Sequence, residues 1–366
     1  MGVQHLVRLA SKTKTVPQDE LYILNEKERR ELRRIERGAI TRAAFAGGLS
    51  GLVCAIPAIV MTPPPAHSSI GSYLAYHGIL ALVIIVASVI EIAYLYWDGL
   101  RTVHQLAHAA GMDLADPALA GDSSSVLWSL ARAALESPNP PNAVPGMDPL
   151  REASKLRVMV AVILYKLKVT ISGFLAKMIL GRLLGRAATR TVLELLAVPV
   201  TAIWDALVCW LIVREARLRV IGPSAAYEFC ALILKEPETL SIQTKQCAVR
   251  AIGAAAVRSK DLHPNLVTLL QAVKSRVGQD TLESIDDSQR FIREIASLSK
   301  QEQTIVLRVL AAASIIAGRV ARDEHELLVQ TWSACGRQFE GATIERLRRN
   351  FISGDPIRAQ DLEAIQ

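Results

Sequence analysis

The chain has 366 residues, enough for two or more domains, and 51% of them are hydrophobic. Its mean hydropathy of +0.27 is high for a soluble protein, and its formal net charge is +7. This composition argues against an ordinary soluble protein. Only 5% of the residues are aromatic, and no basic-aromatic pattern indicates nucleic-acid binding. The five cysteines lack Cys-x-x-Cys spacing, so we expect them to be reduced and structural.

Residues 1–42 form a basic arm that we expect to be helical and cytosolic. Asn25 is placed to cap the helix, with Glu28 as its capping-box partner three residues later. The charges then alternate in sign, so the helix can be solvated up to Arg42 before it continues into an apolar run. Ten basic residues precede that run: Arg8, Lys12, Lys14, Lys27, Arg29, Arg30, Arg33, Arg34, Arg37 and Arg42. Beside a membrane span, such residues favour contact with anionic lipid headgroups rather than with nucleic acid.

Residues 43–97 predict a transmembrane helix hairpin. Residues 43–61 carry no charge over 19 positions, and residues 74–90 carry none over 17. A span needs roughly 20 apolar residues to cross a hydrocarbon core of ~30 Å. The alternative is a pair of buried core helices in a soluble protein. Gly47 and Gly51 have the Gly-x-x-x-Gly spacing that lets another helix approach closely.

The basic arm sets the expected orientation of this hairpin. Positive charge next to a span stays on the cytoplasmic side, and the connecting stretch TPPPAHSSI carries none. The amino terminus is therefore expected inside and the proline-rich loop outside. The first apolar run begins too far along the chain for a cleavable signal peptide. Glu91 precedes an aromatic belt, where it can reach headgroup water or serve in a proton relay.

Residues 98–155 predict a cytosolic helical segment that ends in a proline-rich linker. His104 and His108 share one helix face, a spacing that can bind zinc. The zincin motif, however, needs a glutamate where this chain has Gln105, and no third ligand is evident nearby. No phosphate-binding loop, dinucleotide-binding, hydrolase or kinase motif is present. We therefore expect no enzymatic activity, cofactor or metal.

Residues 156–219 predict a second membrane-embedded helix hairpin that contains charged side chains. Lys166 and Lys177 are 11 residues apart, as are Glu194 and Asp205, so each pair lies on one helix face. If the chain folds back between them, Lys177 meets Glu194 and Lys166 meets Asp205 in a single register. An unpaired charge at the centre of a span costs about 2.5–3.5 kcal/mol on insertion scales, which favours such pairing.

Two features of this second hairpin leave alternatives open. Lys168 lies on the opposite helix face, where Glu91 is one candidate partner. The predicted turn carries Arg182, Arg186 and Arg190, which would violate the positive-inside rule if both limbs crossed the membrane. The hairpin can instead be re-entrant or lie along the cytosolic face.

Residues 220–366 predict a cytosolic helical domain with an internal repeat. The stretches that begin at Val249 and Leu307 each contain an arginine, an Ala-rich helix, a break and a Leu-rich helix. Their offset of about 58 residues suggests duplicated helical pairs, although two Ala-rich helices can also resemble each other by chance. We expect the Ala-rich helices to pack closely.

Residues 240–350 resemble the TerB-like domain of tellurite-resistance proteins. That family is similar in its Ala-rich helix, followed by an Asp-Gly turn and a glutamate six residues after the glycine. In the stretch AGRVARDE, Gly318 and Glu324 match this pattern, but Ala317 replaces the aspartate. The first copy keeps neither feature, so the acidic metal site of the family is eroded. The resemblance implies a helical, membrane-linked module in a stress response.

Together, these features predict an all-α protein with a polytopic helical membrane region and a cytosolic all-helical domain. We expect a multi-pass protein of the bacterial inner membrane with both termini in the cytoplasm. The favoured function is a non-enzymatic scaffold or stress sensor whose carboxy-terminal domain binds a partner protein. The alternative is a small transporter or channel that uses the charged residues of the embedded helices. A homo-oligomer is compatible with either function.

Overall fold

The computed structural model describes Leu24, Met147 and residues 26–65, 69–110, 190–278, 285–355 and 357–365. Every regular element within these ranges is a helix, and none is a β-strand, which confirms the predicted all-α class. The chain divides into two compact units. We call them the three-helix bundle, with its described residues in 33–102 and 190–213, and the helical domain, which holds all the other described residues: Leu24, Met147 and residues 26–32, 103–110, 214–278, 285–355 and 357–365.

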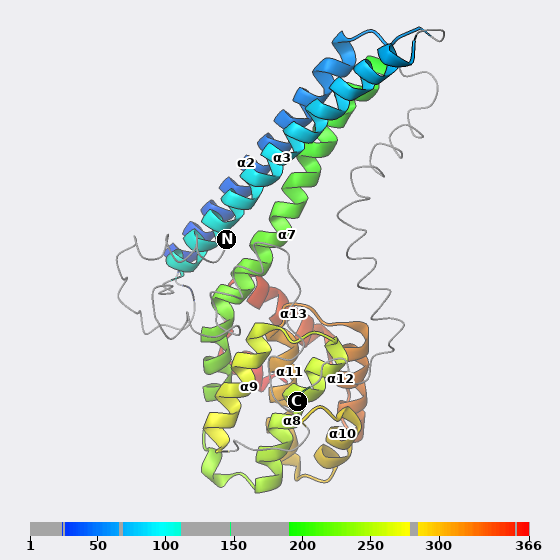
Figure 1. Ribbon diagram of the computed structural model, residues 1–366. Coiled ribbons are helices and arrows are strands. Elements are labelled where there is room, and N and C mark those ends of the chain that lie inside the picture. Colours follow the sequence, from blue (N-terminus) through cyan, green and yellow to red (C-terminus); the bar gives the residue numbers. More distant parts are fainter. Residues whose placement is uncertain are drawn as a thin grey trace. The chain divides into compact units, whose positions relative to one another are not determined.

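Three long helices supply the bundle: α2 (Glu26–Val60), α3 (Ile70–Ala109) and α7 (Arg190–Ile233). They run side by side through it (Figure 1). Residues 26–42 of the arm and the first apolar run form one continuous helix in α2, as expected, whereas the predicted cap Asn25 lies outside the described residues. α2 ends just before the Pro-rich loop, because proline cannot donate the backbone hydrogen bond that a helix needs. The second half of α7, from Arg214, belongs to the helical domain.

Two of the described helices are long and apolar enough to cross a membrane, and they are those of the predicted first hairpin. Within the most apolar window of α3, only 6% is buried inside the structure, and within that of α2, 28%. Large apolar side chains such as Phe45, Leu82 and Ile90 are exposed on these helices. The bundle therefore differs from a soluble helical core, which buries such side chains.

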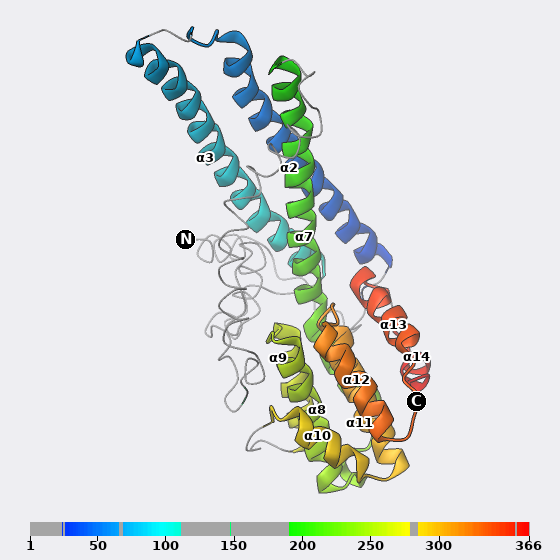
Figure 2. The ribbon, with the colours of Figure 1, turned by 90° about the vertical axis from the view of Figure 1, so that its right-hand side faces the viewer.

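The helical domain is built from short helices after the long helix α7 (Figure 2). They are the 3₁₀ helix η2 (Pro237–Thr239) and the α-helices α8 (Ile242–Ser259), α9 (Pro264–Val277), α10 (Ser288–Ala296), α11 (Lys300–Ile316), α12 (Arg322–Ala334), α13 (Gly341–Ser353) and α14 (Ala359–Glu363). α8 and α11 are its central helices. Their Ala-rich segments are fully buried, and the two helices pack against each other, as expected for small side chains that permit close approach.

The internal repeat has an exact counterpart in the structure. α11 begins 58 residues after α8, and α12 begins 58 residues after α9. The same offset relates the serines that cap α8 and α11, Ser241 and Ser299. It also relates Lys260 and Gly318, which follow these helices with positive φ angles of 56° and 73°. Such agreement in caps and backbone conformation supports duplicated helical pairs over chance similarity.

Contacts at both ends of the Ala-rich helices show how the two copies pack. At their beginning, the Ser241 hydroxyl donates at 2.6 Å to Oε1 of Glu302, which lies three positions beyond the equivalent Ser299. At their other end, Arg319 Nη2 lies 2.9 Å from Asp261 Oδ2, and these two residues are 58 positions apart. α8 and α11 are therefore parallel neighbours. Contact between equivalent residues is the arrangement that an approximate twofold axis along the helices produces.

Candidate functional site

The structure describes only part of the predicted set of embedded charges. Lys166, Lys168 and Lys177 lie outside the described residues. Glu194 falls within α7, but its side chain is not among those described. The pairs Lys177–Glu194 and Lys166–Asp205 therefore stay predictions. Asp205 is described, and its surroundings can be built from the residues of all three helices of the bundle.

Asp205 is buried where α7 passes the glycine face of α2. Its side chain is 9% exposed, and a Cβ atom added at Gly47 would lie 2.4 Å from Asp205 Oδ2. One turn away, a Cβ atom at Gly51 would lie 2.5 Å from Thr201 Oγ1. The Thr201 hydroxyl donates to the Gly47 carbonyl oxygen at 2.9 Å. The predicted glycine spacing thus admits the polar face of α7, and no larger residue fits there without moving the helices apart.

The carboxyl group of Glu91 on α3 is a close neighbour of that of Asp205. Two carboxyl groups at close range repel each other when both are ionised. Asp205 Oδ2 makes no hydrogen bond to the described residues. Sequence reasoning offered Glu91 as a partner for Lys168 or as a headgroup contact, and it did not foresee this pair of acids. The pair brings two carboxyl groups together between α3 and α7.

A second polar contact joins α2 and α3. Arg42 Nε donates to Asp98 Oδ1 at 2.8 Å, and Arg42 Nη2 donates to Thr102 Oγ1 at 3.3 Å. The Asp98 side chain is 4% exposed, whereas that of Arg42 is 39% exposed. Sequence analysis treated Arg42 only as the end of the basic arm. Arg42 precedes the first apolar run and Asp98 follows the second, so the register of an antiparallel hairpin was the signal that would have paired them.

The predicted histidine pair lies near the end of α3, with His104 half-buried and His108 exposed. Among the described residues, no group of three or more His, Cys, Asp or Glu side chains is arranged to hold a metal ion. The aspartates that follow in sequence, Asp113 and Asp116, lie outside the described residues.

The two residues that carry the resemblance to the TerB-like family have structural roles here. Gly318 adopts the left-handed conformation, and an added Cβ atom would lie 2.5 Å from Leu218 Cδ1. Glu324 is 1% exposed, and its Oε2 accepts a hydrogen bond from the Ala321 amide at 3.3 Å. Burial raises the pKa of Glu324 to about 7, and the Ala321 amide and nearby Arg319 only partly oppose this shift.

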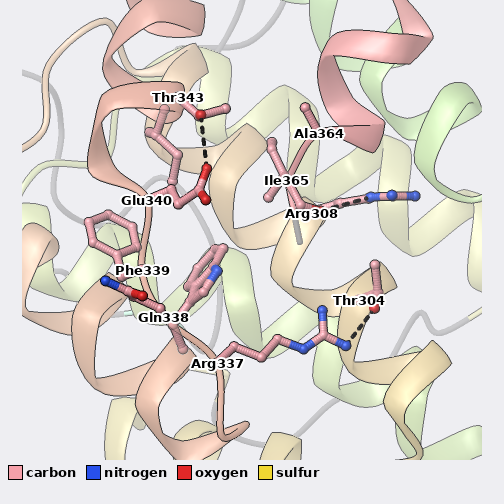
Figure 3. A pocket seen from close by; sticks show the side chains of 11 residues that line it. Thr304, Arg308, Arg337, Gln338, Phe339, Glu340, Thr343, Ala364 and Ile365 are labelled. Carbon is pink, nitrogen blue, oxygen red and sulfur yellow. Dashed lines mark hydrogen bonds between the residues drawn. The ribbon is translucent and has the colours of Figure 1, made fainter.

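The helical domain also contains an open pocket of about 570 Å³, between α11, α12, α13 and the end of the described chain (Figure 3). Trp332 and Phe339 form one wall, with their rings edge to face at 5.4 Å. Arg308 and Arg337 line other sides. Polar and charged residues make up about half of the lining, so the pocket suits a ligand with both polar and apolar groups. Sequence analysis noted Arg308 only as part of the repeat and did not identify Arg337.

We predict that Gly47→Ala destabilises the three-helix bundle by about 1–3 kcal/mol, since the new methyl group would overlap Asp205 and the Thr201 carbonyl oxygen. The neighbouring Gly48→Ala is the matched control, because its Cβ atom would meet only Ala202 Cβ at 3.5 Å. Unfolding of the detergent-solubilised chain by sodium dodecyl sulfate measures both variants. Equal stability of the two would contradict the close contact between α2 and α7.

We also predict that Glu324 makes stability pH-dependent. The folded-state pKa of about 7 exceeds the ordinary value of 4.5, so the folded chain binds the extra proton between these values. The free energy of unfolding should therefore fall as pH rises from about 4.5 to 7, by roughly 3 kcal/mol in total. Glu324→Gln cannot ionise, and its stability relative to wild type should rise over this interval. Urea titrations of both chains in detergent at several pH values measure the difference, and parallel pH profiles would refute it.

Comparison of the chain with protein-family models, with curated proteins and with solved structures finds no match in any of the three. The resemblance of residues 240–350 to the TerB-like domain therefore stays a prediction. Function must be argued from the geometry of the bundle and of the helical domain.

Proposed function

We propose that this chain is an integral membrane protein whose helical domain is a non-enzymatic binding module on the cytosolic side, in the role of a scaffold or sensor. The observation that carries the proposal is the uneven distribution of exposed large apolar side chains. Among the described residues there are seven on α2, twelve on α3 and six on the first half of α7, but three in the rest of the chain. Lipid is the solvent that such a surface requires.

The charge pattern supports an orientation with both termini in the cytosol. The first turns of α2 carry seven of the ten basic residues of the arm, whereas residues 61–70, between the apolar helices, carry no Lys or Arg. Positive charge stays on the cytoplasmic side of a span. An even number of crossings then returns the chain to the cytosol, where the helical domain is free to meet partners. Its well-packed core and open pocket support a binding role.

The buried acids of the bundle favour transport as a second candidate function. Glu91 and Asp205 bring two carboxyl groups together on largely apolar helices, and carboxyl groups in such positions often form part of proton or ion pathways. The ion pair of Arg42 with Asp98 adds a second polar layer between α2 and α3. These contacts also serve simply to join the helices, which is the interpretation that the scaffold function requires.

A cysteine-accessibility experiment tests the membrane proposal. Ser69→Cys, in the loop, should react with a membrane-impermeant maleimide in intact cells, because the loop is expected outside. Glu326→Cys, on the half-exposed side of α12, should react only after the cells are permeabilised. Labelling is measured above that of the parent chain with its five native cysteines. The reverse pattern, or release of the chain from membranes by alkaline carbonate, would refute the proposal.

Flux measurements in liposomes decide between the two functions. If the chain transports protons, a pH gradient should collapse faster across vesicles that contain it. Asp205→Asn should then abolish the effect, whereas Glu326→Gln, which alters a half-exposed carboxylate of the helical domain, should preserve it. The scaffold function predicts no flux from either the wild-type chain or the variants. Ion flux that requires Asp205 would replace the scaffold function with the transport function.

A further inference from the structure

Equivalent arginines in the two repeats of the helical domain differ in their ion pairing. Arg250 on α8 is 4% exposed and pairs with Glu294 of α10, which neutralises its charge. Arg308 is its equivalent on α11, 58 residues later. Among the described residues, no carboxylate lies within ion-pair distance of Arg308. The residue 58 positions after Glu294 is the apolar Ile352, and Arg308 lines the pocket instead of pairing with an acid there.

The guanidinium group of Arg308 is anchored but not neutralised. It donates to two carbonyl oxygens, those of Glu363 at 3.1 Å and Ile365 at 3.4 Å. Its remaining nitrogen, Nη1, donates no hydrogen bond to the described residues. The carbonyls hold the side chain in place, so little side-chain entropy would be lost when a ligand binds.

Arg337 adds a second cation to the same pocket. Its Nη2 donates to the Lys300 carbonyl oxygen and to Thr304 Oγ1, each at 2.8 Å, and no carboxylate of the described chain pairs with it. Burial lowers the pKa of Arg308, and the neighbouring Arg337 lowers it further, although Glu363 opposes both effects. Two guanidinium groups that repel each other in a partly buried pocket favour the binding of an anion.

Nearby acidic groups offset only part of this charge. Glu363 acts on Arg308, but its carboxylate also pairs with Lys235, with Oε1 3.7 Å from Nζ. Glu340 lines the pocket on the side away from Arg308, where its Oε2 accepts from the Thr343 hydroxyl at 3.5 Å (Figure 3). The basic side of the pocket is thus separated from an aromatic side formed by Trp332 and Phe339.

We propose that this pocket binds an acidic segment of a partner protein, with a carboxylate side chain at Arg308 and Arg337 and an adjacent apolar side chain against Trp332 and Phe339. The carboxylate takes the place that Glu294 holds beside Arg250 in the first repeat. A volume of about 570 Å³ holds a few side chains rather than a folded domain. The inference rests on the proposed binding function and names its site and the chemistry of its partner.

An array of capped peptides tests the pocket directly. Each peptide contains Glu next to Leu or Phe, and each has a matched peptide with Gln in place of Glu. The detergent-solubilised full chain should bind Glu peptides at least tenfold more tightly than their Gln counterparts. Arg337→Gln and Arg308→Gln should each reduce that binding tenfold or more, and added salt should weaken it. Arg322→Gln should have no effect, because it removes a 91%-exposed arginine that does not line the pocket.

The possible results distinguish failure of the proposed peptide site from failure of the proposed membrane binding function. Thermal melting of each variant shows whether it is folded, and Arg337→Gln supplies the test if loss of the carbonyl contacts unfolds Arg308→Gln. The proposal that the pocket binds an acidic segment is overturned if Glu and Gln peptides bind equally. It is also overturned if folded variants of both arginines keep their binding. Binding to vesicles of anionic phosphatidylglycerol with none to peptides overturns it too. The proposed function is refuted independently of the peptide results, either if alkaline carbonate extracts the chain from membranes or if ion flux requires Asp205.

Discussion

A carboxyl group on an apolar helix needs polar neighbours, and the bundle is arranged around this need at Asp205. Burying an unpaired charge costs several kcal/mol in a low-dielectric environment, so the group must share a proton or find a cation. Glu91 is its polar neighbour on α3, and the absence of a side chain at Gly47 makes the space. Thr201, one turn before Asp205, ties α7 to the backbone of α2. This polar contact thus determines which faces of the three helices meet. Their apolar side chains alone would allow many relative orientations.

The helical domain satisfies a different constraint, which is the close parallel packing of α8 against α11. Alanine at the contact lets the backbones approach, and the ends of the helices are then fixed by polar contacts between equivalent parts of the repeat. A duplicated unit buries its contact face against its own copy, so a single small core suffices. The same symmetry explains why a left-handed residue follows each Ala-rich helix, although only the second copy uses glycine there.

Much of the fold could be predicted from the sequence because it depends on periodic signals. The charge-free runs located the helices of the first hairpin, and the 58-residue offset located the paired helices of the domain. The acidic pair was missed because Asp205 was matched to Lys166 by register along the chain, and Glu91 was assigned to headgroup water or to Lys168. Register within one hairpin says nothing about which face a third helix presents. Arg42 with Asp98 shows the converse, since that pair follows from hairpin register alone and was overlooked because Arg42 was assigned to the arm.

Differences between copies of a repeat are informative because the fold itself constrains both copies equally. Arg250 and Arg308 occupy equivalent helix positions, so packing alone gives no reason for one to have a carboxylate partner and the other to have none. In the first repeat the ion pair joins two helices of the domain, α8 and α10. In the second, the arginine is held by carbonyl oxygens and joined by Arg337, an arrangement that costs electrostatic repulsion and contributes nothing evident to the core. Such a cost is understandable if the charge is used by something outside the chain. Loss of an internal partner from one copy is thus a simple route by which a duplicated structural unit acquires a binding site.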